Sequence, residues 1–173
     1  MLTEGQGDIL FVCGWAYNDT VSCKACAGEW PAKDHKIADL GLTVAYLHND
    51  QFFTGWTVLV LKRHATELFD LTREERSQLI EEVTEVSRTL AVVFDAVKIN
   101  YELLGNQLPH IHWHIIPRLA DDPAPREAVW TVKHDPKRLS PHEFRERVSH
   151  IQNHLSIRRG TENSQHGHVP SKK

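Results

Sequence analysis

LPHIHWHIIPR, residues 108–118, places three histidines at every second position of an otherwise apolar run. Side chains of a β-strand alternate between the two faces of its sheet, so His110, His112 and His114 share one face. Neighbouring imidazoles are then about 7 Å apart, from a rise of about 3.3 Å per residue, and can act on one ligand. Three histidines without a role are the less favoured alternative, because burying unpaired polar rings costs stability.

Two chemistries could use this row of imidazoles. Three histidines can bind zinc and leave one position open for an activated water, which would make a metallohydrolase. Alternatively, one neutral imidazole can attack a phosphorus atom and form a covalent phosphoramidate, while its neighbours bind phosphate oxygens or move protons. The strand by itself leaves both chemistries open.

The composition is that of a soluble globular domain, with 40% hydrophobic and 25% charged residues in 173. The net charge of −3 gives no broad basic field for a nucleic-acid polymer, although a local cationic pocket for a nucleotide remains possible. Near the start, residues 9–13 form a short apolar run preceded by acids, which fits neither a signal peptide nor a membrane span. The sequence therefore predicts a cytoplasmic protein with no membrane partner.

The pattern of the central region predicts an α+β fold. Residues 42–48 and 56–64 are rich in β-branched and apolar residues and form a hairpin, and residues 97–105 and 110–117 form two more strands. Between these pairs, apolar residues recur every three or four positions in a long helix, which begins with a capping box of Thr72 and Glu75. We expect an antiparallel meander sheet of four strands with this helix packed on it.

Three further regions surround the domain expected over residues 21–120. Residues 1–20 are an N-terminal extension, and residues 121–156 start as an irregular segment with two prolines. That segment continues into a C-terminal helix, for which Ser140 caps, Pro141 takes the first helical position and Glu143 completes a capping box, with an end at about Leu155. The polar and aperiodic residues 157–173 are expected to be a disordered tail.

The cysteines predict a metal site. Their number, three, argues against a disulfide framework, and Cys23 and Cys26 have the spacing with which two thiolates share one metal. A redox pair is the weaker alternative because no convincing strand precedes it. His64 ends one predicted strand and His110 begins another, so a sheet that joins those ends would complete a Cys2His2 site; otherwise His64 only decorates a strand end.

Four blocks in register, SCKACAGEW, LVLKRHATELFDL, NYELLGN and PHIHWHIIPR, resemble the histidine triad (HIT) family of nucleotide hydrolases and transferases. The similarity spans residues 22–118. It implies a HIT-like fold in which His112 is the nucleophile that takes up the α-phosphate and His114 contacts that phosphate. It also implies a structural zinc held by the two cysteines and two histidines of the predicted metal site, namely Cys23, Cys26, His64 and His110.

The resemblance also assigns substrate contacts and shows where the chain departs from the family. Asn100 matches an asparagine near the phosphate, and Gly105, Asn106 and Gln107 lie in the loop that wraps it, although this loop replaces a longer glycine-rich one. Gly55-Trp56 stands where many members have Gly-His, so a fourth histidine of the site is missing. The ribose-binding aspartate has no clear match, since the nearby Asn49 and Asp50 are shifted in register.

These residues together predict a hydrolase that acts at the α-phosphate of a nucleotide and releases a nucleoside monophosphate, AMP for an adenosine substrate. The substrate would be a nucleoside phosphoramidate or a dinucleoside polyphosphate. A nucleotidyltransferase or phosphorylase of the same family and a nucleotide-binding protein with little turnover are the alternatives. The family also implies a homodimer with the long helix and a sheet edge at its interface.

Four other side chains have two interpretations each. Phe52 and Phe53 could line a base pocket but are more readily explained as core residues that anchor their loop. His48 could contact a sugar or lie on the surface. Arg118 could reach a phosphate or be solvated.

Overall fold

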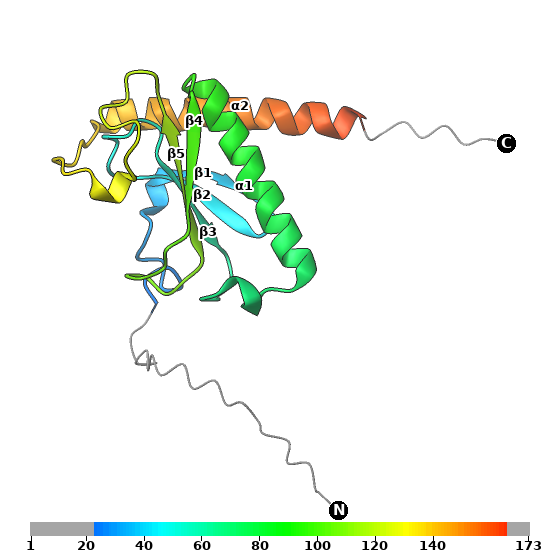
Figure 1. Ribbon diagram of the computed structural model, residues 1–173. Helices are drawn as coiled ribbons and strands as arrows, with labels where there is room; N and C mark the ends of the chain where they lie inside the picture. Colours follow the sequence, from blue (N-terminus) through cyan, green and yellow to red (C-terminus); the bar gives the residue numbers. More distant parts are fainter. Residues whose placement is uncertain (1–22, 166–173) are drawn as a thin grey trace, which may run out of the picture.

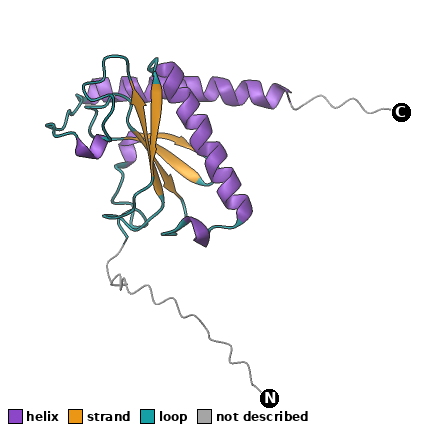
Figure 2. Ribbon diagram, in the orientation of Figure 1, coloured by secondary structure: helices purple, strands orange, loops and turns teal. Residues whose placement is uncertain are grey.

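The computed structural model describes residues 23–165, which form one antiparallel sheet with helices on one of its faces (Figures 1 and 2). The sheet has five strands in the order β1-β2-β3-β5-β4, and every neighbouring pair is antiparallel. The strands are β1 (Lys36–Asp39), β2 (Thr43–Leu47), β3 (Thr57–Leu61), β4 (Lys98–Glu102) and β5 (His112–Arg118). The α+β fold, the hairpin and the two later strands are thus confirmed, but the sheet is not a simple meander, because β5 and not β4 pairs with β3.

The first strand, β1, was missed by the sequence pattern. It is only four residues long, KIAD, with charged residues at both ends and one buried side chain, Ile37. It pairs with β2 at the edge of the sheet with an irregular register. Such a short segment has no period of alternation to detect, so the predicted four strands were one too few.

Helix α1 (Arg73–Val93) begins as predicted. The Thr72 hydroxyl accepts from the backbone N–H of Glu75 at 3.1 Å, while the Glu75 carboxylate accepts from the N–H of Thr72 at 2.8 Å. Its apolar stripe packs on the sheet in a core that includes the residues between the histidines, and its buried apolar members are Leu79, Val83, Val86 and Leu90. The helix therefore covers the face opposite the imidazoles of the histidine strand.

Helix α2 (Pro141–Gln165) lies against α1 and β1 through Val148, Ile151 and Leu155. The predicted box at its start is confirmed, since Ser140 and Glu143 bond each other's backbone N–H groups. The predicted end at about Leu155 is wrong, because the helix continues to Gln165 and includes residues expected in the tail. Residues 1–22 and 166–173, with the rest of the expected extension and tail, lie outside the described residues. Within the described range, no helix is long and apolar enough to cross a bilayer.

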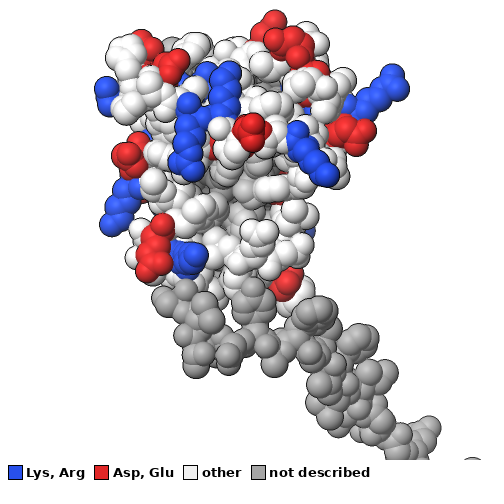
Figure 3. Space-filling model, turned by 90° about the vertical axis from the view of Figure 1, so that its left-hand side faces the viewer, with Lys and Arg blue, Asp and Glu red and all other residues white. Residues whose placement is uncertain are grey.

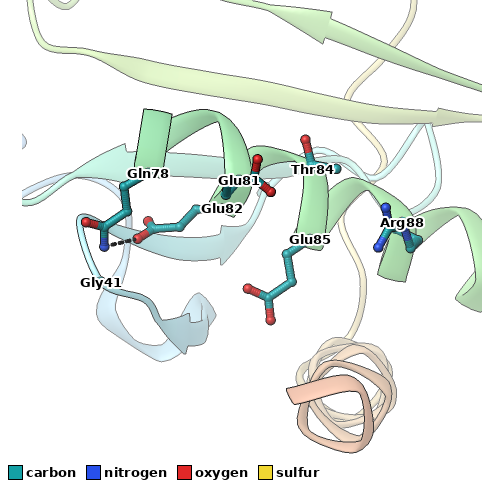
Figure 4. A pocket seen from close by; sticks show the side chains of 7 residues that line it. All are labelled: Gly41, Gln78, Glu81, Glu82, Thr84, Glu85 and Arg88. Atoms are coloured by element: carbon teal, nitrogen blue, oxygen red, sulfur yellow. Dashed lines mark hydrogen bonds between the residues drawn. The ribbon is translucent and has the colours of Figure 1, made fainter. Parts of the chain in front are cut away.

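One buried carboxylate joins α1 to the turn between β1 and β2. Glu82 accepts from the backbone N–H groups of Leu42 at 2.7 Å and Thr43 at 2.9 Å, and from the Thr43 hydroxyl at 2.7 Å. Figure 4 shows the hollow beside it, where Gln78 donates to Glu82. A Cβ on Gly41 would lie 2.0 Å from the Gln78 amide, so a larger residue there would displace the Gln78 side chain from Glu82. The carboxylate is fully used in holding the helix to the sheet.

The opposite face of the sheet is covered in part by residues 119–137, which include the 3-10 turn η3 (Val129–Thr131). A second, smaller core lies here, formed by Phe53, Trp56, Ile116 and Val129 with Phe52 packed against it. Phe52 and Phe53 are therefore core residues that anchor the loop between β2 and β3, as the more favoured interpretation held.

Arg118 holds the start of this segment and is neither solvated nor free to bind a phosphate. Its side chain is buried and pairs with the Asp122 carboxylate, and it donates to the Asn100 side chain and to two backbone carbonyls of the segment. A buried guanidinium needs such partners for each of its donors. Both interpretations of Arg118 from the sequence were wrong.

Asp50 holds the end of the segment. Its carboxylate accepts from the backbone N–H groups of Phe52 at 2.9 Å and Lys137 at 3.0 Å and contacts Nε2 of His134 at 2.8 Å. Nδ1 of His134 donates to the carbonyl of Val132 at 2.9 Å, so both ring nitrogens face acceptors and the imidazolium form fits best. Burial alone would raise the pKa of Asp50 and lower that of His134, but these bonds outweigh it and shift both pKa values the other way.

The Asp50–His134 pair should make stability depend on pH. The raised pKa of His134 contributes to the free energy of unfolding. This contribution is complete below pH 6.5, the ordinary pKa of histidine, and is lost as pH rises through the folded-state pKa. The lowered pKa of Asp50 gives a second contribution to stability, which is complete above pH 3.8, the ordinary pKa of aspartate, and is lost as pH falls through its folded-state pKa. We expect Asp50→Asn to cost about 2 kcal/mol at pH 5.5 and clearly less at pH 9, measured by urea unfolding. Asp121→Asn, at an exposed position of residues 119–137, is the control, and an equal cost at both pH values would contradict the ionic account.

Candidate active site

Three histidines lie where the histidine strand faces away from the helices. His110 immediately precedes β5, while His112 and His114 belong to it and pair with Val60 and Val58 of β3. All three are buried, with 2%, 6% and 6% of their surface exposed. The ring centroids of His112 and His114 are 5.1 Å apart. The alternation of the sequence predicted three rings on one face, and the predicted metal site separated His110 from the other two. The structure likewise brings His112 and His114 together as a pair and places the His110 ring at the cysteine cluster.

The tautomer of His112 follows from its hydrogen bond. Its Nδ1 lies 2.6 Å from the carbonyl oxygen of His110, which can only accept, so Nδ1 carries the proton. Burial lowers the pKa of His112, and the bond to the carbonyl opposes this only in part. The ring is therefore neutral at neutral pH and has a lone pair on Nε2, which is what a nucleophilic imidazole requires.

His114 has the opposite arrangement. The indole Nε1–H of Trp56 donates to its Nδ1 at 3.1 Å, so the His114 proton is on Nε2. Burial, with smaller effects of the His112 and His48 rings, lowers the pKa of His114 to about 3. His48 stacks on Trp56 with 4.1 Å between ring centroids, so its half-buried ring supports the indole. His114 is thus held as a neutral donor beside the neutral imidazole of His112.

Trp56 contacts the histidine pair in a way that the sequence did not reveal. The Gly55-Trp56 pair was recognised only as the loss of a histidine, whereas the structure places its indole on the imidazole of His114. Gly55 makes the turn before it, with φ of +83° and no room for a Cβ, which would lie 2.5 Å from the Phe94 ring. The turn therefore directs the Trp56 side chain under the histidine pair.

The residues expected to contact the phosphate lie on β4 and in the loop that follows it. Asn100 on β4 is opposite Ile116, on the histidine face, yet its side-chain oxygen already accepts from Arg118. Gly105, with φ of +71°, and the exposed Asn106 and Gln107 lie in the loop that leads from β4 to His110. Their contact with a phosphate stays a prediction.

A second cluster lies at the His110 end of the strand. It consists of Cys23, Cys26, His64 and His110, whose ligand atoms all lie within 4.8 Å of one another. Nδ1 of His110 is 3.5 Å from the sulfur of Cys23 and 3.6 Å from that of Cys26, and Nδ1 of His64 is 3.4 Å from the Cys26 sulfur. The four predicted ligands are therefore brought together, although the grouping does not by itself identify the ion.

The geometry of this cluster fits zinc. Zinc–sulfur and zinc–nitrogen bonds of about 2.3 and 2.05 Å at tetrahedral angles separate sulfur from nitrogen by about 3.6 Å, close to the distances above. His110 directs its Nε2 to the carbonyl of Leu61 at 2.7 Å, which fixes its ring and leaves Nδ1 for a metal. Burial raises the pKa of Cys26, as do the hydrogen bond and charge of Cys23, so two thiolates here require a cation.

Two tryptophans border the histidine pair. The Trp30 ring is 5.1 Å from that of His112, and the Trp130 ring is 5.0 Å from that of His114. Trp130 belongs to η3, is about half exposed, and its Nε1 donates to the Glu102 carboxylate on β4. Neither Trp130 nor Glu102 was singled out in the sequence, because η3 is distant in the chain and only its folding over the sheet brings it to His114.

Comparison with known proteins places this arrangement among relatives. The family model described as HIT domain matches residues 30–121. Adenosine 5′-monophosphoramidase of Schizosaccharomyces pombe is 24% identical over 99 residues, which cover 57% of this chain and 73% of the relative. The asymmetrical bis(5′-nucleosyl)-tetraphosphatase of the same yeast is 28% identical over 95 residues. These residues cover 52% of this chain and 52% of the relative.

Solved structures agree with the fold. A histidine triad protein from Bradyrhizobium japonicum is 32% identical, with a TM-score of 0.65, covering 71% of this chain and 92% of that one. A zinc-bound histidine triad family protein from Mycobacterium smegmatis is 20% identical, with a TM-score of 0.59, covering 80% of this chain and 94% of that one. At that identity the second comparison shows the shared fold alone.

Proposed function

The chain belongs to the HIT domain family, and we propose that it is a hydrolase that cleaves nucleotides at the α-phosphate through a covalent intermediate on His112. The observation that carries this proposal is the tautomer of His112, whose Nδ1–H is held by the His110 carbonyl while Nε2 keeps its lone pair. The relatives named as a phosphoramidase and a tetraphosphatase support the substrate class. Both names imply attack at a phosphorus atom of a nucleotide.

The reaction would have two steps. In the first, Nε2 of His112 forms a bond to the α-phosphorus, the bond to the leaving group breaks, and a leaving amine takes up a proton from water. In the second, water attacks the phosphorus, the phosphorus–Nε2 bond breaks, the nucleoside monophosphate departs, and the proton of the water goes to solvent. His112 returns to its starting tautomer, with its Nδ1–H bonded to the carbonyl throughout.

His114 would stabilise charge rather than supply the proton. Its Nε2–H is its single proton, since Nδ1 accepts from Trp56, and giving it up would leave an imidazolate. A neutral N–H donor aimed at a phosphate oxygen stabilises the developing negative charge of the transition state. The side chains of Asn106 and Gln107 and backbone N–H groups near Gly105 could add donors, and Asn100 would help to place this loop end through Arg118.

We also propose that zinc at the cysteine cluster is structural. When bound, the ion would link Cys23, Cys26 and His64 to His110, and so stabilise the end of the strand that carries the nucleophile. The His110 ring belongs to the cluster, and its carbonyl accepts from His112. The ion would thereby hold the acceptor that sets the tautomer of the nucleophile.

The direct test is AMP release from adenosine 5′-phosphoramidate, followed by chromatography. We expect steady release by the wild-type protein. Tight AMP binding without release from this substrate or from diadenosine polyphosphates would overturn the hydrolase and leave a nucleotide-binding protein. Formation of a nucleoside diphosphate with added inorganic phosphate would show instead that the intermediate is passed to another acceptor.

Seen from the side of residues 119–137, basic and acidic side chains are interspersed (Figure 3), which suits a small ligand better than a polymer.

Trp56→Phe should isolate the role of the indole N–H. It keeps an aromatic ring on His48 but removes the donor to His114, so the proton of His114 can move to Nδ1. We expect kcat for AMP release to fall about 10- to 100-fold with a smaller change in KM. Trp56→His is the matched control, because an imidazole can donate to the same nitrogen and should retain more activity. An unchanged kcat in Trp56→Phe would show that the indole does not orient His114.

The oligomer is a further expectation, and we propose a homodimer formed through the β4 edge. β4 is an edge strand of the sheet. Tyr101 on it is 46% exposed, and Val97 and Leu104, which lie just before and after it, are 69% and 53% exposed. Ile80 and Val92 of α1 are also exposed apolar residues. Light scattering should give about twice the chain mass of 19.8 kDa, and a monomer at micromolar concentration would rule this out.

A further inference from the structure

Glu102 is a carboxylate beside the histidine pair that the proposed reaction does not use. It lies at the end of β4, where its Cα partner across the strands is His114. Directly opposed residues of an antiparallel pair point to the same face with Cβ atoms about 5 Å apart. The Glu102 carboxylate therefore belongs to the surface on which His114 would contact a phosphate.

The surroundings of Glu102 leave its charge without a cation. Its carboxylate accepts from the Trp130 indole, whose ring lies 5.0 Å from that of His114. Within residues 23–165 it forms no salt bridge, and the nearby Arg118 is already paired with Asp122. Burial raises the pKa of Glu102, and the charge of Arg118 opposes this only in part. A half-buried carboxylate without a paired cation attracts a positively charged ligand and repels a negatively charged one.

The negative charge of Glu102 interacts differently with the two leaving groups that the relatives suggest, an amine and a polyphosphate. A polyphosphate leaving group carries several negative charges, whereas an amine is neutral or, with a second ammonium, positive. A group bonded to the phosphorus atom near His114 lies within about one Debye length of Glu102, roughly 10 Å at 0.1 M salt, and is not fully screened. The electrostatic interaction therefore favours amines.

We propose that Glu102, oriented by Trp130, selects the leaving group of this site: amines, and above all amines with a second positive charge, are preferred over polyphosphates. The inference rests on the proposed hydrolase and narrows it to the phosphoramidase type. Glu102 acts here as a specificity residue, and the covalent step on His112 stays as described.

The test compares kcat/KM for three adenosine substrates. Two are 5′-phosphoramidates, one of butylamine and one of 1,4-diaminobutane with its free ammonium, and the third is diadenosine tetraphosphate. We expect the wild-type protein to prefer the diaminobutane compound over the butylamine compound, and both over the tetraphosphate. Glu102→Gln should lower the first preference by about tenfold and raise the relative rate on the tetraphosphate. Glu81→Gln, the same charge change on α1, should leave both ratios unchanged.

Two further measurements keep the proposal open to failure if Glu102→Gln is unstable. Glu102→Asp preserves the charge and should keep the order of the substrates, and added salt should reduce the wild-type preference for the ammonium. AMP release from none of the three substrates would contradict the proposed hydrolase itself. Release with ratios that neither Glu102→Gln nor salt changes would leave the hydrolase intact and overturn the role of Glu102.

Discussion

Replacement of His112 by alanine should reduce AMP release from adenosine 5′-phosphoramidate by at least about 10⁴-fold. The variant lacks the Nε2 of His112, which the bond from Nδ1–H to the His110 carbonyl leaves with its lone pair beside the His114 donor. Loss of a covalent nucleophile removes the whole two-step path, whereas loss of a single donor leaves the path intact and slower. The rates of wild type and variant are compared by chromatography at saturating substrate, after circular dichroism has shown that both are folded.

The covalent intermediate can be tested apart from turnover. Rapid acid-free quenching of the wild-type protein with radiolabelled substrate should leave about one nucleotide per chain on the protein, stable to alkali and labile to acid, as expected for a phosphorus–nitrogen bond. His114→Gln is the matched variant: it should turn over slowly but still become labelled. Labelling of His112→Ala would show that another group is the nucleophile.

The fold was predictable where its signals are local. The capping boxes of Thr72 and Ser140 set the starts of both helices, and the alternation around His112 gave the strand and its two faces. The end of α2 was not predictable. The residues beyond Leu155 continue the helix, but they are polar and have no apolar stripe that would indicate it. β1 was missed because it is held by pairing with β2 and hardly by its own composition.

The sequence predicted which residues form the site better than it predicted what each of them does there. The spacing of Cys23 and Cys26 and the strand ends at His64 and His110 gave the metal cluster that the structure brings together. The tautomers of His112 and His114 depend on a carbonyl and an indole, and no pattern in the sequence reports such hydrogen bonds. Contacts made by η3 depend on how residues 119–137 fold over the sheet, which the sequence alone does not specify.

Cys23→Ser should remove the metal and much of the stability. A closed four-ligand site implies about one zinc per chain in the wild-type protein, measured by mass spectrometry of the metal, and close to none in the variant. We expect the free energy of unfolding to fall by about 3 to 5 kcal/mol and the melting temperature by roughly 10 °C, since binding to the folded state alone is folding energy. Cys13→Ser is the matched control, because Cys13 is not one of the four proposed ligands, and it should keep both the zinc and the melting temperature.

The same variant separates a structural zinc from a catalytic one. If three histidines held a catalytic ion, Cys23→Ser would keep its zinc, and chelation would abolish the reaction at any temperature. With the ion at the cluster, the His112 ring carries no metal, and its Nε2 is available whether or not zinc is bound. Chelated protein held well below its melting temperature should therefore still be labelled on His112, at a reduced rate because the His110 carbonyl is less firmly held. Complete loss of labelling in folded, zinc-free protein would place the metal in the reaction itself.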